Sequence, residues 1–203
     1  MLISKEEKLL THFRGYLVGR RYYQAQRALD IMMTSMEGMI RKDGVTPVWA
    51  HSLSVAAYTR NLPIPDSDME NIIIVALLHD VVEDTEYPSA QIKEIFGNEV
   101  WTSVKLLTKN SKLSTEEYYK GIPTNALASI VKGADRIHNL STMTGVFSTD
   151  KVTQYIQESQ NYVLPMLRLA KHTHPQYNEV FEGEKHIINL QIERELSALE
   201  VTS

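Results

Sequence analysis

The chain has 203 residues, of which 43% are hydrophobic, so it is long enough to bury a full apolar core within one domain. Twenty-one basic residues stand against twenty-five acidic ones, and the net charge of −4 argues against a surface built to bind nucleic acid. The sequence contains no cysteine, which excludes disulfides and thiolate metal ligands.

The first ten residues, MLISKEEKLL, lack the apolar run of a signal peptide. The longest apolar stretch, residues 72–78, is much shorter than the ~20 residues that a membrane span requires. We therefore expect a cytoplasmic protein without a membrane partner. The sequence leaves its oligomeric state open.

Apolar residues recur three and four positions apart along almost the whole chain, and no segment keeps a period-two alternation. This pattern predicts an all-α fold, a single domain over residues 1–203 with about 8–10 helices. The helices are expected, in chain order, at residues 5–14, 18–38, 50–61, 67–84, 89–96, 98–108, 114–120, 125–143, 150–171 and 178–199.

Local signals support several of these boundaries. The segments Ser67–Glu70 and Ser114–Glu117 have the spacing of capping boxes, in which a serine and a glutamate three residues later satisfy free backbone N–H groups. Gly97 is suited to a left-handed helix end. The Arg41–Gly44 segment, followed by Pro47, predicts a loop just before the helix that carries His51.

The helix expected at 67–84 combines an apolar body with a highly polar end. Residues 72–78 are apolar all round, so this helix should run through the core. Its last two turns carry His79, Asp80, Glu83 and Asp84. Burying several carboxylates at a helix C-terminus is costly unless a cation neutralises them, and a divalent metal ion would do so.

Two other segments add donors of the same kind. His51 begins an amphipathic helix, and Asp135 follows another apolar run at a level that should face the core. A His-Asp pair alone is more often a surface or capping feature. Together with His51 and Asp135, however, it supplies two imidazoles and two carboxylates, a set that suits Mn²⁺, Fe²⁺, Mg²⁺ or Zn²⁺.

Five motifs occur in an order that resembles a known family. They are RKDG (41–44), ALLHDVVEDT (76–85), FGNEV (96–100), LLTK (106–109) and KGADRIHN (132–139). The set, spread over about residues 20–170, resembles the hydrolase domain of Rel/Spo enzymes in the HD phosphohydrolase superfamily, an all-α fold. Those enzymes remove the 3′-pyrophosphate from the stringent-response alarmones ppGpp and pppGpp. Since the chain ends at Ser203, it resembles the stand-alone small alarmone hydrolases.

The resemblance implies a role for each matching residue. One divalent ion, for which the family favours Mn²⁺, would be held by His51, His79, Asp80 and Asp135. Glu83 and Asp84 would orient the attacking water and take its proton. The nucleotide substrate would be contacted by Arg41, Lys42, Lys132, Arg136 and Asn139.

Other interpretations remain open at this point. The same metal site could act on another nucleotide, such as NADPH or a (d)NTP, because one sequence does not define the pocket walls. A non-catalytic module that binds an alarmone is a further alternative, although a pure sensor needs neither the metal ligands nor Glu83 and Asp84. Without the resemblance, Arg41 and Lys42 would be read as a solvated basic turn, Arg136 as part of a surface ion pair and Asn139 as a helix cap.

Overall fold

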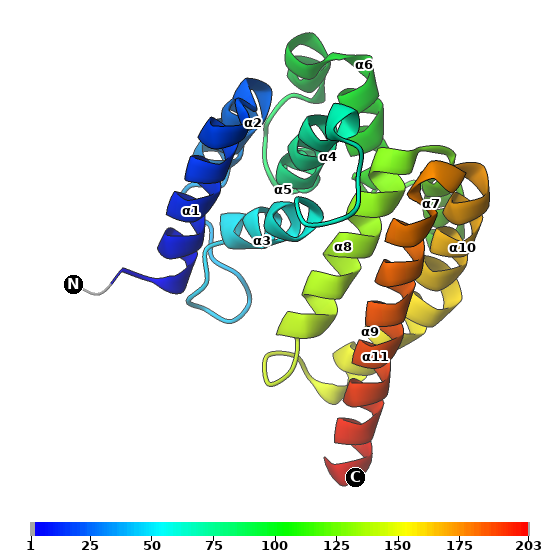
Figure 1. Ribbon diagram of the computed structural model, residues 1–203. Helices are drawn as coiled ribbons and strands as arrows, with labels where there is room; N and C mark the ends of the chain where they lie inside the picture. Colours follow the sequence, from blue (N-terminus) through cyan, green and yellow to red (C-terminus); the bar gives the residue numbers. More distant parts are fainter. Residues whose placement is uncertain (1–2, 203) are drawn as a thin grey trace. The chain divides into compact units, whose positions relative to one another are not determined.

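A computed structural model describes residues 3–202. Within them the chain forms helices and no β-strand, apart from one isolated bridge between Ile40 and Pro47, so the all-α prediction is confirmed. The chain divides into two compact units, residues 1–109 and 110–203 (Figure 1). In the described part of the chain, no helix has the length and apolar character needed to cross a membrane.

The first unit is organised around helix α4. Its helices are α1 (Lys5–Arg20), α2 (Tyr23–Ser35), α3 (Trp49–Thr59), α4 (Asp66–Leu78), α5 (Val81–Asp84) and α6 (Ser89–Leu107). Helix α4 packs against α2, α3 and α6. Residues 72–78 are at most 1% exposed, which confirms that this apolar run lies in the core.

The boundary between the first two helices was predicted wrongly. The sequence suggested an end at residue 14 and a new helix from 18, but α1 continues to Arg20. Phe13 and Leu17 are fully buried, and this packing outweighs the weak helix propensity of the intervening Gly15. The break falls at Arg21, which adopts the left-handed conformation with φ 59°.

The single helix expected at 67–84 is also wrong in detail, because it is divided at His79 and Asp80. Helix α4 ends at Leu78 and the short α5 begins at Val81, with Asp80 at φ −99° and ψ −9° between them. The i, i+4 spacing nevertheless persists, since the Asp84 N–H donates to the Asp80 carbonyl oxygen over 2.9 Å. The carboxylates therefore belong to the turn after α4.

The capping box predicted at Ser67–Glu70 is absent. Helix α4 begins at Asp66 after Pro65, without a side-chain cap. The Glu70 carboxylate instead accepts the backbone N–H groups of Gln24 and Ala25, at 2.9 and 3.2 Å. These groups lie in the first turn of α2, whose own N-terminal residue provides no side-chain cap. Glu70 therefore caps a neighbouring helix.

Gly97 does mark a backbone break, as predicted. Its φ is 85°, a conformation open to glycine, but helical hydrogen bonding resumes on both sides. The two helices expected at 89–96 and 98–108 are thus joined in one kinked α6. The capping box at Ser114–Glu117 is present and begins α7.

The second unit is organised around helices α8 and α11. It contains α7 (Thr115–Gly121), η1 (Ile122–Thr124), α8 (Ala126–Thr142), α9 (Thr149–Glu158), the π-helical turn η2 (Ser159–Val163), α10 (Leu164–Thr173), η3 (Pro175–Tyr177) and α11 (Asn178–Thr202). Helix α8 matches the predicted 125–143 closely. It packs against α11 and α10.

Candidate metal centre and catalytic residues

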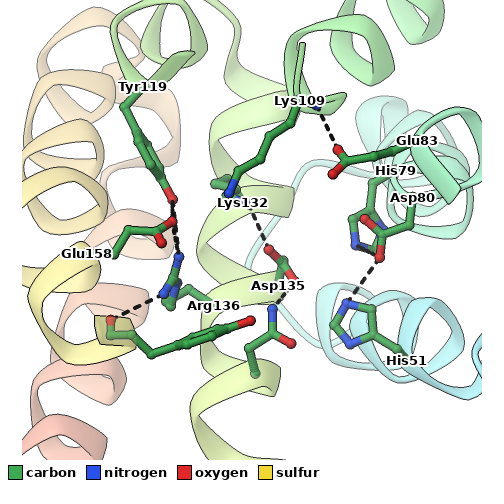
Figure 2. A network of polar contacts seen from close by, with 12 residues as sticks. His51, His79, Asp80, Glu83, Lys109, Tyr119, Lys132, Asp135, Arg136 and Glu158 are labelled. Atoms are coloured by element: carbon green, nitrogen blue, oxygen red, sulfur yellow. Dashed lines mark hydrogen bonds and ion pairs between the residues drawn. The ribbon is translucent and has the colours of Figure 1, made fainter. Parts of the chain in front are cut away.

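Two imidazoles of the first unit face one carboxylate oxygen. His51 lies in the first turn of α3, and His79 follows the last residue of α4. The Nε2 atoms of His51 and His79 lie 3.5 and 3.2 Å from Oδ2 of Asp80. Figure 2 shows the two rings and this carboxylate directed toward one another. The first unit thus brings three of the four predicted metal ligands together.

The backbone fixes the orientation of His79. Its Nδ1 lies 2.8 Å from the Ala76 carbonyl oxygen, which can only accept a hydrogen bond, so Nδ1 carries the proton. Nε2 is then the ring nitrogen that can offer a lone pair to a metal. His51 and His79 are only 5% and 3% exposed, whereas the Asp80 side chain is 31% exposed. The two imidazoles are therefore buried, and the Asp80 carboxylate is partly exposed.

The two predicted water-handling carboxylates lie in α5 and have different surroundings. Oε2 of Glu83 accepts the backbone N–H of Lys109 over 2.7 Å, a contact drawn in Figure 2. The pKa of Asp84 is raised, first because neighbouring atoms desolvate its carboxyl, and then because Asp80 and Glu83 place negative charge beside it. Glu83 is anchored to the backbone, whereas the surroundings of Asp84 disfavour the charged form of its carboxyl.

Arg41 and Lys42 occupy an ordered loop before α3. The Arg41 N–H donates to the Thr46 carbonyl oxygen over 2.8 Å, and Oδ1 of Asp43 accepts the N–H groups of Val45 and Thr46. Hydrogen bonds from Thr46 and Val45 lower the pKa of Asp43 to about 2. Lys42 is exposed and Arg41 half-buried. The loop therefore holds its two basic residues on a defined backbone.

In the second unit, three of the predicted site residues meet on one face of α8. Nζ of Lys132 donates to Oδ2 of Asp135 over 2.9 Å (Figure 2). Nδ2 of Asn139 donates to Oδ1 of the same carboxylate over 2.5 Å. Asp135 is only 6% exposed. Burial is the largest influence and opposes the charge on Lys132, but Asp135, Tyr118 and Tyr119 together outweigh it, and the pKa of Lys132 is raised. The shared face predicted from the i−3 and i+4 spacing is present.

Arg136 points in another direction. It is 3% exposed, and its Nη2 donates to Oε1 of Glu158 over 2.7 Å and to the Tyr119 hydroxyl over 3.1 Å. Its Nη1 donates to the Tyr155 carbonyl oxygen over 3.2 Å. The predicted substrate contact of this residue stays a prediction, while its buried guanidinium is engaged within its own unit.

Sequence reasoning did not select Tyr119, Glu158 or the backbone N–H of Lys109. Glu158 lies 22 positions after Arg136, and Tyr119 lies 17 before it, so no helical spacing connects them. The tyrosine pair at 118 and 119 was visible, but a packing role is the commoner outcome for such residues. Only the fold reveals these partners.

The HD domain family profile matches residues 28–163, which are 136 of the 203 residues of the chain. The chain belongs to the HD domain family. Membership implies a divalent metal ion, and the imidazoles and carboxylates described above are a donor set of the right kind. The matched segment includes residues of both compact units.

Individual relatives of this HD domain support the Rel/Spo resemblance. A guanosine-3′,5′-bis(diphosphate) 3′-pyrophosphohydrolase from Aquifex aeolicus is 31% identical over 169 residues, covering 79% of this chain and 23% of the relative. The GTP pyrophosphokinase rsh of Brucella ovis is 30% identical over 131 residues, covering 59% and 17%. The chain thus spans about a fifth of the length of these curated relatives.

A solved structure is similar over a larger share of its length. It is described as a metazoan ortholog of SpoT that hydrolyzes ppGpp and plays a role in starvation responses. It aligns with a TM-score of 0.62 and 25% identity, covering 79% of this chain and 95% of the matching chain. The fold of this chain therefore agrees with that of the similar ppGpp-hydrolysing protein.

Proposed function

We propose that this chain is a metal-dependent hydrolase that removes the 3′-pyrophosphate from ppGpp and pppGpp. The products would be pyrophosphate with GDP or GTP. The observation that carries the proposal is the convergence of the His51 and His79 Nε2 atoms on Oδ2 of Asp80, directly before the Glu83–Asp84 pair. The names of the relatives and of the similar structure support the choice of substrate.

The metal would be held by His51, His79 and Asp80, with Asp135 as the fourth ligand assigned from the family pattern. The donor chemistry fits, because the His79 tautomer leaves Nε2 for a metal and because nitrogen and oxygen ligands without thiolate suit Mn²⁺. When bound, such an ion lowers the pKa of a ligated water and offsets charge on the attacked phosphoryl group.

The protein's own carboxylates would manage the proton. Burial and neighbouring negative charge raise the pKa of Asp84, which follows Glu83 in α5, and we assign it as the general base. Glu83, held by the Lys109 N–H, would orient the water. The water oxygen forms a bond to the 3′-phosphorus while the bond from this phosphorus to the ribose 3′-oxygen breaks. The 3′-oxygen takes a proton and leaves as the hydroxyl of GDP or GTP.

Basic and amide side chains would bind the nucleotide. Arg41 and Lys42 are proposed to stack on the base and pair with phosphate, because their loop has a fixed backbone and offers two cations. Lys132 and Asn139 would contact phosphate or ribose from the face of α8 that they share with Asp135. We further propose that residues 1–203 act as one functional domain in the cytoplasm.

A substrate panel tests this proposal. The Mn²⁺-loaded protein is incubated with ppGpp, pppGpp, NADPH and dNTPs in water enriched in ¹⁸O, and the products are separated by anion exchange. We expect pyrophosphate from both alarmones, with the ¹⁸O label in pyrophosphate and none in GDP or GTP. If only NADPH or a dNTP is hydrolysed, that nucleotide would be the substrate in place of the alarmones. Alarmone binding without turnover would identify a non-catalytic module.

A further inference from the structure

Next to the Asp135 cluster, about 100° around the helix, Arg136 connects α8 to one carboxylate oxygen of Glu158. Oε1 of Glu158 accepts hydrogen bonds from Nη2 of Arg136 over 2.7 Å and from the Tyr119 hydroxyl over 2.6 Å. These residues belong to α9, α8 and α7 (Figure 2). Three helices of the second unit thus meet at one partly buried carboxylate, whose side chain is 19% exposed.

The surroundings hold this carboxylate in place. The Arg136 guanidinium lies over the Tyr155 ring, 5.0 Å from its centroid, and Nη1 donates to the Tyr155 carbonyl oxygen. The Tyr119 ring stacks on Tyr162, with centroids 5.5 Å apart and planes 16° apart. Burial raises the pKa of Tyr119, so its hydroxyl remains a donor at neutral pH. The anchor therefore has little freedom to rearrange.

The backbone beside Glu158 is unusual in the same place. The π-helical turn η2 starts at Ser159, directly after Glu158, and its Ser159 hydroxyl donates to the Tyr155 carbonyl oxygen over 2.6 Å. A π-turn inserts one extra residue and shifts the following side chains around the helix. Tyr155 and Glu158, before the turn, contact Arg136 of α8, while Val163 at its end and Leu164 after it are buried.

Arg136 is the residue next to Asp135, and this adjacency gives the anchor its effect. Successive helix residues point about 100° apart, so a fixed Arg136 determines the rotation of α8 about its axis at this turn. That rotation sets the direction of the Asp135 carboxylate and of its neighbours Lys132 and Asn139. Shifts of about 1 Å in such groups are enough to reduce catalysis strongly.

We propose that Glu158 is a positioning residue which, through Arg136 and Tyr119, aims the Asp135 face of α8. The proposal rests on the assignment of Asp135 as a metal ligand in the proposed function. It gives Arg136 a role inside the protein in place of the substrate contact expected from the sequence. A buried ion pair is a weak source of net stability, so orientation is the better explanation for this one.

The test compares Glu158→Gln, which removes the charge and keeps the shape, with Glu182→Gln. Glu182 is also paired with two cations, Lys171 and Lys185, but its side chain is 45% exposed and it lies on α11. For each variant we would measure the Mn²⁺ dissociation constant by paramagnetic resonance, the thermal midpoint, and kcat and KM for ppGpp.

We expect Glu158→Gln to weaken Mn²⁺ binding and lower kcat by about 10–100-fold, the usual effect of losing a residue that orients a metal ligand. KM should change much less, and Glu182→Gln should resemble the natural protein. A fall in the thermal midpoint with Mn²⁺ affinity and kcat unchanged would overturn the proposal, because that is the result of a purely structural role.

A second variant covers the case in which Glu158→Gln does not fold. Tyr119→Phe removes one hydroxyl and keeps the stacked ring, so it should fold and reduce Mn²⁺ affinity by a smaller factor in the same direction. Unchanged affinity in a folded Tyr119→Phe protein would contradict the anchor. If the natural protein binds Mn²⁺ but releases no pyrophosphate, the proposed function fails, and the Mn²⁺ affinities still decide the role of Glu158.

Discussion

Asp80 presents the oxygen atom that the His51 and His79 imidazoles face. Replacing it by alanine leaves His51 and His79 without the carboxylate that completes their donor set. Losing a residue that only orients a metal ligand typically lowers metal affinity by about 10–100-fold. We expect Asp80→Ala to lower Mn²⁺ affinity by more than this and to abolish turnover. Calorimetric Mn²⁺ titration and the pyrophosphate assay measure the two effects.

A matched control for this variant is Asp66→Ala. Asp66 is an exposed carboxylate in the same unit, and it pairs with Arg20 at 2.5 Å. Its loss should leave both Mn²⁺ binding and turnover unchanged. Normal activity in Asp80→Ala would remove Asp80 from the metal site.

Glu83 and Asp84 are adjacent, and their environments predict different effects of neutralising each. Asp84→Asn removes the proposed base and should lower kcat by about 10²–10⁴-fold while Mn²⁺ binding persists. Glu83→Gln keeps an oxygen that can accept the Lys109 N–H, so its effect on kcat should be smaller. Single-turnover kinetics compare the two. Equal losses, or a larger loss in Glu83→Gln, would reverse our assignment of the base.

At the scale of helices, Glu70 connects the first turn of α2 to α4. Glu70→Ala leaves the Gln24 and Ala25 N–H groups without this acceptor, and we expect a loss of about 1 kcal/mol in the free energy of unfolding. Ser67→Ala should have almost no effect on stability, because the exposed Ser67 hydroxyl donates to the Asp68 side chain and does not cap α4. Urea unfolding measures the loss of stability in both variants. A larger loss in Ser67→Ala than in Glu70→Ala would show that Ser67 and Glu70 form the capping box after all.

The packing of α8 on α11 includes a buried acid without a partner. Glu184 is fully buried, and neither carboxylate oxygen has a hydrogen-bond partner among the described residues. It lies against Gly133, where a Cβ atom would overlap the carboxylate. Gly133→Ala should therefore cost about 1–3 kcal/mol of stability. Adding Glu184→Ala should recover part of this loss in a double-mutant cycle.

Burial also raises the pKa of Glu184 well above its usual range, which gives stability a pH dependence. Below about pH 4.3 the carboxyl is protonated in the folded and unfolded states alike. As the pH rises, the unfolded chain releases its proton first, so the free energy of unfolding falls until the pKa of the folded state is reached. Glu184→Gln removes this loss, and its stability advantage in urea unfolding should grow from pH 4 to pH 7. A constant difference would show that the carboxyl ionises freely in the folded protein.

Periodicity and motif spacing predicted the elements that depend on neighbouring residues. Helix α8, the Ser114 capping box and the buried run at 72–78 follow from patterns of three and four residues. The break at His79 and Asp80 was missed because the backbone departs only slightly from helical dihedral angles there, so the helical spacing of the side chains continues across it. The partners of Arg136 were missed for another reason: contacts between distant segments depend on packing that local propensity does not encode.

At the scale of the whole molecule, the proposed metal ligands are divided between the two compact units, with His51, His79 and Asp80 in residues 1–109 and Asp135 in residues 110–203. A ligand that binds only the folded protein stabilises it by about 2.7 kcal/mol at 100 times its dissociation constant. Mn²⁺ should therefore raise the thermal midpoint of the natural chain.

The rise in the thermal midpoint on adding Mn²⁺ tests whether His51 and Asp135 are both ligands. We expect His51→Asn in the first unit and Asp135→Asn in the second each to lose most of the Mn²⁺-dependent increment measured by calorimetry. The exposed His172 is a matched control for the imidazole, because His172→Asn alters neither donor set and should retain the full increment. If Asp135→Asn kept the increment and His51→Asn lost it, the ion would be held by residues 1–109 alone. Since each variant removes one donor and keeps a side chain of similar size, loss of most of the increment in both would support one ion bound by both donors.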